Sequence, residues 1–204
     1  MKNVFAICGL LAGFLFIGGD LLGVALWKGY KILFQSISEL TATGAPTRPV
    51  VLPIFLLSHL LLVAFGFAIW EAAGENAGMK VLSVLVIGNG LSSVIAALFP
   101  MTLGRTARLS DPGAALGAIS VVLMVAALIV AAIATDGWVR WLSIGVVAAF
   151  AALTVVGLTL QATPHIGLQE RVMSYGWLIW VGIVAIALLR SELSSGGAFR
   201  PLAT

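Results

Sequence analysis

The chain has 204 residues, of which 61% are hydrophobic and 9% are charged, and its formal net charge is +3. Soluble domains are about 45–50% apolar and ~25% charged, so this composition excludes a soluble fold and indicates an integral membrane protein. The single cysteine, Cys8, excludes a disulfide scaffold. The 11 Lys and Arg are dispersed along the chain and form no basic patch, so we expect no nucleic-acid partner.

Six long apolar runs follow one another, each close to the ~20 residues that a membrane-spanning helix needs. Backbone groups in lipid must be satisfied within the segment, and no run alternates with a period of two, so we expect helices rather than barrel strands. The sequence predicts an all-α, polytopic transmembrane six-helix bundle with both termini on the same side. One membrane domain, 1–190, is followed by a short flexible C-terminal tail, 191–204. The expected spans are 4–27, 50–70, 79–100, 113–134, 141–161 and 172–189.

The first span carries two pairs of glycines at a spacing of four residues, Gly9 with Gly13 and Gly19 with Gly23. Small residues at this spacing allow helices to approach closely. We therefore expect the first span to pack tightly inside the bundle. The same glycines also allow a homo-oligomer to form through this span.

Asp20 is the only acidic residue inside the expected spans. A carboxylate at the centre of a span costs about 2.5–3.5 kcal/mol on insertion scales and normally faces protein or water. Asp20 lies about 10 Å from the end of its span, and His59 lies about 14 Å from the same side on the antiparallel second span. We therefore expect Asp20 and His59 to form a buried pair, with Glu170 and Arg171 at the mouth of the site.

Two interpretations of this polar group stay open. The polar side chains are either hydrogen-bonding contacts that fix the register of the helices, or the lining of a pocket that binds a head group or moves a proton. For the second interpretation, the candidate residues of the pocket are Asp20, Ser38, Glu39, His59, Asn89, Gln161, Glu170 and Arg171.

Three longer connections, 28–49, 101–112 and 162–171, lie on one side of the predicted membrane and combine Pro, Ser or Thr with charged residues. In the first of them, Ile37 and Leu40 share a helical face, whereas Ser36, Ser38 and Glu39 lie away from it. We expect this stretch to fold back over the bundle as a lid on the pocket. The alternative is a loop that rests on the lipid head groups.

The distribution of basic residues does not decide the orientation. Five Lys and Arg belong to the side of the termini and six to the opposite side: Lys2, Lys80, Arg140, Arg190 and Arg200 against Lys28, Lys31, Arg48, Arg105, Arg108 and Arg171.

Short motifs in these loops resemble those of the domain of unknown function 998 family of bacterial and archaeal integral membrane proteins. They are the stretch from Ser36 to Leu40, the Phe99–Pro100 pair that closes the third span, and the entry into the last span from Gly167 to Arg171. The resemblance covers nearly the whole chain and implies a six-span fold with no established reaction. Together with the common retention of short tails inside the cell, it places the protein in the plasma membrane with cytoplasmic termini.

Two functions of different class are compatible with these features. The first is a non-enzymatic protein that binds or helps distribute a membrane lipid through a polar pocket open to the long loops. The second is an intramembrane enzyme acting on a lipid, with Asp20, His59 and Glu170 as acid and base groups. We favour the first and assign no catalytic residue. Two histidines without metal-ligand spacing, and no nucleotide-binding loop, lead us to expect neither a metal nor another cofactor.

Overall fold

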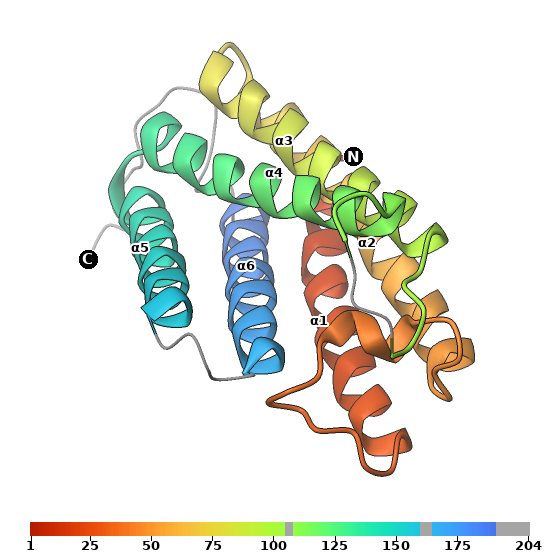
Figure 1. Cartoon of the computed structure of the whole chain (residues 1–204). Helices are drawn as coiled ribbons and strands as arrows, with labels where there is room; N and C mark the ends of the chain where they lie inside the picture. The colour runs from red at the N-terminus through yellow and green to blue at the C-terminus, as the bar shows by residue number, and fades with distance from the viewer. Residues whose placement is uncertain (105–107, 160–164, 191–204) are drawn as a thin grey trace.

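The computed structural model describes residues 1–104, 108–159 and 165–190, and leaves the side chains of 156–159 undescribed. Six long helices make up most of this part of the chain (Figure 1). They are α1 (Lys2–Leu26), α2 (Arg48–Ala73), α3 (Ala77–Leu98), α4 (Pro112–Ala134), α5 (Gly137–Thr159) and α6 (Ile166–Leu189), with a short 3-10 helix, η1 (Ile37–Thr41), between α1 and α2. All six are long and apolar enough to cross a membrane, so the all-α six-span prediction is confirmed. The predicted tail, 191–204, lies outside the described residues.

Several helices begin before their predicted span boundaries. The backbone N–H groups of a first turn have no partner within the helix, and capping groups or water can satisfy them, so a helix can begin outside its apolar run. Asn76 caps α3, its side chain accepting a hydrogen bond from the backbone N–H of Met79 at 3.0 Å. Proline stands in the first turn of both α2 and α4, where its missing N–H costs nothing. The largest difference is in α6, which begins at Ile166 rather than near 172. Glu170 and Arg171 therefore belong to the helix itself.

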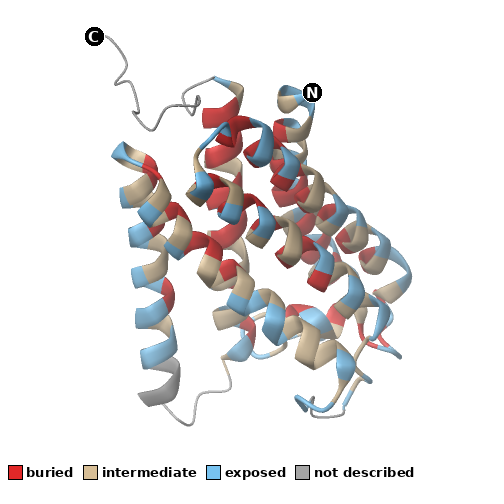
Figure 2. Cartoon of the chain, turned by 90° about the horizontal axis from the view of Figure 1, so that it is seen from above, coloured by how far each residue is buried: buried red, intermediate tan, exposed pale blue. Residues whose placement is uncertain are grey.

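The helices form a ring in chain order. Each packs against the next, and α6 contacts α1, which closes the ring. In Figure 1, α5 and α6 run side by side, and α4 crosses the view at a steep angle to them. The buried residues lie mainly where the helices pack against one another, whereas the outer faces of the helices are exposed (Figure 2). Large apolar residues such as Phe14, Val122 and Ile133 are among the most exposed, as expected of faces that contact lipid.

The glycines of α1 make close contacts within the chain. A Cβ atom at Gly9 would lie 2.5 Å from the ring of Phe65, and one at Gly19 would lie 2.8 Å from Ile54, so both face α2. Gly23 faces η1 and α2, and Gly13 faces α6. The glycine pairs thus give the close packing inside the bundle that their spacing predicts. Formation of a homo-oligomer through this span stays a prediction.

The helix η1 packs onto the loop end of the bundle. Ile37 and Leu40 are buried against α1 and α2. Ser36 and Glu39 form a capping box at its N-terminus. The connection that contains η1 is tied to the α3–α4 connection by two backbone hydrogen bonds, between Thr43 N–H and Met101 and between Leu103 N–H and Thr43. The structure thus confirms that this stretch folds back over the bundle.

Candidate functional site

The central polar contact is a buried ion pair between α1 and α6. Arg171 donates from Nε to one oxygen of Asp20 at 2.9 Å and from an Nη to the other at 2.8 Å. Tyr175, one turn further along α6, donates its hydroxyl to the same carboxylate. Asp20 is completely buried and Arg171 nearly so. The prediction that Asp20 faces inward is correct, but its predicted partner is wrong: Asp20 pairs with Arg171 and not with His59.

The remaining donors of Arg171 hold the loop that follows α1. One Nη donates to the carbonyls of Ile32, Gln35 and Gly167 at 2.7, 3.1 and 3.1 Å, and the other donates to the hydroxyl of Tyr30 at 2.9 Å. A guanidinium carries five N–H donors, and all of them point at acceptors here. Arg171 is therefore saturated by protein groups, and it joins α1, α6 and the 30–36 loop.

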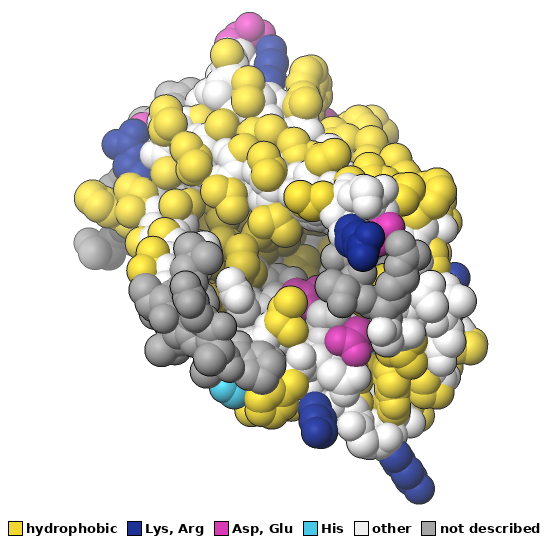
Figure 3. All heavy atoms as spheres, in the orientation of Figure 1, with side chains coloured by type: hydrophobic (Ala, Val, Ile, Leu, Met, Phe, Trp, Pro, Cys, Tyr) yellow, Lys and Arg dark blue, Asp and Glu magenta, His cyan; other side chains and the backbone are white. Residues whose placement is uncertain are grey.

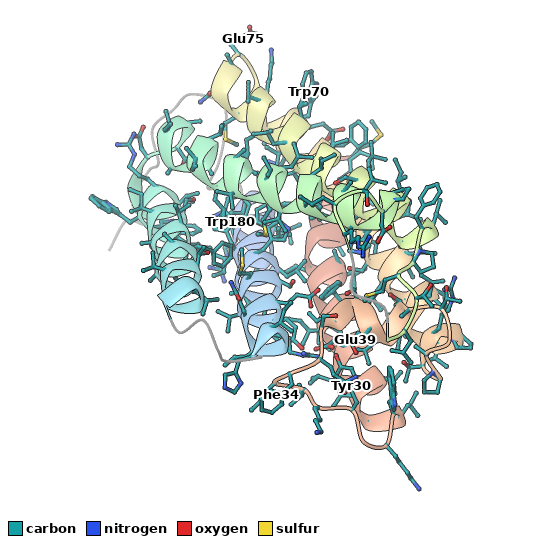
Figure 4. The ribbon with its side chains drawn as sticks, viewed as in Figure 1. Tyr30, Phe34, Glu39, Trp70, Glu75 and Trp180 are labelled. Carbon is teal, nitrogen blue, oxygen red and sulfur yellow. The ribbon has the colours of Figure 1, made fainter. Side chains whose placement is uncertain are left out.

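Tyr30 continues this network into the loop. Its hydroxyl accepts from Arg171 and donates to the carbonyl of Ser36 at 2.7 Å. Burial raises the pKa of Tyr30 to about 12, although the guanidinium beside it acts in the opposite direction. The hydroxyl therefore keeps its proton across the physiological range. Figure 4 shows Tyr30 at the end of the bundle where Glu39 also lies, opposite to Glu75.

Gly167 allows α6 to reach this loop. A Cβ atom at this position would lie 2.3 Å from the carbonyl oxygen of Gln35 and 2.4 Å from that of Ile32. These are two of the carbonyls that Arg171 binds. The backbone N–H of Leu168 also donates to the carbonyl of Leu33 at 3.2 Å. Only glycine leaves room for the loop to lie directly on the first turn of α6.

Glu170 contacts η1 rather than the ion pair. Its carboxylate accepts a hydrogen bond from the backbone N–H of Ile37 at 2.7 Å. Glu170 is half-buried, and it stands on the wall of a cavity. The pair that was expected at the mouth of the site thus separates: Arg171 lies in the interior of the polar network, and Glu170 faces the cavity.

The cavity has a volume of 770 Å³ and lies inside the ring of helices, between α2, α3, α4 and α6, with η1 at its loop end. Figure 3 shows a hollow in this face of the molecule, with hydrophobic side chains above it and acidic side chains near its lower edge. Its walls are mainly apolar. They include Phe16, Leu52, Phe55, Leu62, Phe99, Val121, Met124, Met173 and Leu178.

Polar groups interrupt these walls at two depths. Near the loops the cavity is lined by Ser38, Thr41 and Glu170. Deeper, a cluster joins α3 and α4: the amide of Asn89 donates to the carbonyl and the hydroxyl of Ser120, each at 2.8 Å, and Ser93 contacts the same hydroxyl.

His59 also lines the cavity from α2. Its ring lies beside that of Phe16, with 5.8 Å between the centroids. Within the part of the chain that the structure describes, the ring makes no hydrogen bond with Asp20 or Glu170. His59 therefore offers its imidazole to the cavity and not to a protein partner.

The predicted pocket residues thus fall into three groups. Ser38, His59, Asn89 and Glu170 line the cavity, whereas Asp20, Glu39 and Arg171 do not. Glu39 instead caps η1 and accepts from Gln35 at 2.8 Å. Gln161 lies outside the described residues.

Sequence reasoning missed Tyr30, Tyr175 and Ser120. Tyr175 follows Arg171 by four residues, so once α6 is extended over Arg171 both side chains fall on one helical face. That spacing could have indicated from the sequence that Tyr175 lies beside Arg171. The positions of Tyr30 and Ser120 depend on the path of a loop and on the pairing of α3 with α4.

The family model described as "Protein of unknown function (DUF998)" matches residues 10–187, which is most of the chain. The chain belongs to the DUF998 family. This DUF998 protein matches none of the curated proteins and none of the solved structures. Within the described ranges it also has no group of three or more His, Cys, Asp or Glu side chains that could hold a metal ion. Its chemistry must therefore be inferred from the cavity.

Proposed function

We propose that this DUF998 protein binds an amphiphilic lipid molecule in the cavity between α2, α3, α4 and α6, and holds it or passes it on without chemical change. The observation that carries the proposal is the cavity itself, 770 Å³ in volume, with apolar walls in the spans and polar groups toward the loops. Pockets for drug-sized ligands are typically about 300–1,000 Å³, mostly apolar, with a few polar groups that orient the ligand. A hydrocarbon chain suits the walls, and a head group suits the loop end.

The alternative, an enzyme with Asp20, His59 and Glu170 as acid and base groups, has less support. Asp20 accepts three hydrogen bonds from Arg171 and Tyr175 and does not line the cavity. General acid–base catalysis needs groups within hydrogen-bond reach of a substrate proton, and a carboxylate engaged in this way offers none. The remaining two side chains do not bond with one another within the described ranges.

Native mass spectrometry of the protein released from lipid nanodiscs tests the proposal. The wild type is expected to retain one lipid or fatty-chain molecule. Gly117 lines the cavity, and a Cβ atom there would meet nothing within 4 Å, so Gly117→Leu projects a side chain into the cavity without a clash at Cβ. We expect this variant to lose the bound molecule.

Gly145→Leu is the matched control, because Gly145 is exposed on α5, lies outside the cavity lining, and has equally open space around its Cβ position. It should retain the ligand as the wild type does. Absence of any ligand from the wild type, or equal retention by all three proteins, would overturn the proposal. Recovery of a chemically altered lipid would favour the enzyme instead.

The six spans make this a multi-pass membrane protein. We propose that it resides in the plasma membrane with both termini in the cytoplasm, so that the loop end of the cavity faces outward. This orientation rests on short tails commonly remaining inside the cell.

A further inference from the structure

Among the residues that the structure describes, the charged groups that line the cavity are of one sign. Among the described residues of the lining, Glu170 and Asp111 are carboxylates, and neither Lys nor Arg is present. Asp111 already has protein partners, one of them the backbone N–H of Arg108 at 3.0 Å. Glu170 is therefore the carboxylate of the cavity wall whose negative charge a bound ligand would compensate.

The hydrogen-bond partners of Glu170 carry no positive charge, although the neighbouring Arg171 acts on its carboxylate through space. Its partners are the backbone N–H groups of Ile37, at 2.7 Å, and Ser38. The neighbouring Arg171 cannot pair with it, because all five donors of that guanidinium point at Asp20, Tyr30 and loop carbonyls. A carboxylate offers about four acceptor sites, so Glu170 keeps capacity for a further donor.

A half-buried carboxylate inside a membrane protein is stabilised by a cation placed next to it. An anionic head group, in contrast, would need a guanidinium or ammonium group, and the described lining supplies none. The deeper polar cluster adds no free amide donor for an anionic head group, because the Asn89 amide already donates to Ser120. The cavity thus favours a cationic donor over a phosphate or sulfate.

The volume limits the hydrophobic part of the ligand. At 770 Å³ the cavity lies within the range of pockets that enclose one drug-sized molecule. That size suits a single alkyl chain with a small head group. The apolar side chains from α2 and α4, such as Phe55 and Val121, provide the surface on which such a chain would lie.

We propose that the ligand is a single-chain amphiphile with a primary ammonium head group, which the carboxylate of Glu170 binds at the loop end of the cavity. This inference rests on the proposed function and adds the ligand class. Because Glu170 also accepts a hydrogen bond from the first residue of η1, the head group lies directly beside η1.

Four probes test the ligand class: dodecylamine, dodecanol, dodecyl phosphate and butylamine. Thermal unfolding is followed in nanodiscs of phosphatidylcholine, with the three long-chain probes added at equal mole fractions and butylamine from the aqueous phase. Dodecylamine is expected to bind about tenfold more tightly than dodecanol or dodecyl phosphate, as expected for one desolvated charge pair. Butylamine is expected not to bind, because it lacks the chain.

Glu170→Gln isolates the charge, because a Gln side-chain oxygen still accepts from the Ile37 N–H. This variant should lose the preference for dodecylamine and keep the binding of dodecanol, with backbone hydrogen exchange at Ile37 showing that η1 stays folded. Glu39→Gln is the matched control: it removes a charge from η1, the helix that Glu170 contacts, at a position outside the cavity lining, and Gln also serves in a capping box. It should behave as the wild type.

The outcomes separate this inference from the proposed function. Equal or tighter binding of dodecyl phosphate, or an unchanged preference in Glu170→Gln, would overturn the ammonium ligand and leave the lipid cavity standing. If butylamine binds as tightly as dodecylamine, the alkyl chain contributes nothing, and the site binds soluble amines instead of an amphiphile. If no long-chain probe binds, both proposals fail.

Discussion

At the scale of single residues, Asp20 and Arg171 show how a chain can carry two charges into a membrane. Desolvation of each charge costs several kcal/mol, and this cost is offset only when the geometry is good and the remaining donors and acceptors are satisfied. Both conditions hold here, since the pair is bidentate and its other hydrogen bonds go to Tyr30, Tyr175 and backbone carbonyls. The pair therefore joins α1 to α6 and positions a loop, and it is not available to a ligand.

Removal of either partner should destabilise the protein strongly, because the other charge stays buried without compensation. We expect Asp20→Asn and Arg171→Gln each to lower the free energy of unfolding by about 3–5 kcal/mol. The double variant should lose less than the sum of the two, because both single changes break the same pair. Reversible unfolding in mixed micelles measures these differences.

His59 provides the control for this cycle. Since His59 does not bond with Asp20, the effects of His59→Gln and Asp20→Asn should add within about 0.5 kcal/mol. Strong coupling between these two positions, or additive losses for Asp20 and Arg171, would contradict the arrangement described here.

The raised pKa of Tyr30 makes the free energy of unfolding depend on pH. Its pKa is raised to about 12 in the folded protein, mainly by burial, against an ordinary value of 10. The unfolded state therefore releases the Tyr30 proton first as the pH rises. The contribution of Tyr30 to the free energy of unfolding is fully present below pH 10 and is lost as the pH rises from 10 through about 12.

Titration of phenolate absorbance in a Tyr175→Phe background, where Tyr30 is the remaining tyrosine, should give a midpoint near 12. A midpoint near 10 would show that Tyr30 is exposed to water.

The sequence was sufficient to predict that Asp20 faces inward, because only the cost of a charge in lipid was needed. It was not sufficient to choose the partner. A charged residue at the edge of an apolar run predicts the end of the span there, which places Arg171 in the loop. In the structure Arg171 lies five residues into α6, which is about 8 Å along the axis, deep enough to reach Asp20.

At the scale of elements, the contact between α6 and the 30–36 loop depends on one position without a side chain. We expect Gly167→Ala to displace the loop, because the new Cβ atom would overlap the carbonyl oxygens of Gln35 and Ile32. Overpacking of this kind typically costs about 1–3 kcal/mol. Unfolding in micelles measures the loss, and backbone hydrogen exchange should become faster at Leu168, whose N–H donates to Leu33.

Gly145→Ala is the comparison for this change, since a Cβ atom at Gly145 meets nothing within 4 Å. It should leave the stability unchanged or raise it slightly, because alanine favours helix more than glycine does. Equal behaviour of the two variants would mean that the close approach at Gly167 is not needed.

The helices and η1 differ in how far the sequence could predict them. Each long helix contains an apolar run whose length alone indicates a span, so the number and order of the helices were predictable. Their ends were not, because α5 and α6 begin several residues before their apolar runs. For η1 the apolar spacing of Ile37 and Leu40 predicted the buried face, but the anchor on Glu170 depends on tertiary packing.

At the scale of the whole molecule, the cavity results from the order of the helices around the ring. It requires α4 to pack between α3 and α5 in the ring instead of filling the centre, and no periodicity within a single span encodes that arrangement. The apolar walls consist of ordinary span residues, which could equally have faced lipid. The cavity residues that the sequence did mark, His59, Asn89 and Glu170, were identifiable because polar groups in a membrane must face protein, water or a ligand.

Labelling of single cysteines tests the topology of the whole chain. In a Cys8→Ser background, Glu75→Cys in the α2–α3 turn and Lys28→Cys after α1 should react with a membrane-impermeant maleimide from opposite sides, because α2 separates them. Figure 4 places Glu75 at the end of the molecule opposite to Tyr30, which lies close to Lys28 in the chain. With cytoplasmic termini, Lys28→Cys reacts in intact cells and Glu75→Cys reacts only after the membrane is opened. The reverse pattern would keep the six-span fold and invert its orientation, and reaction of both from one side would contradict a spanning α2.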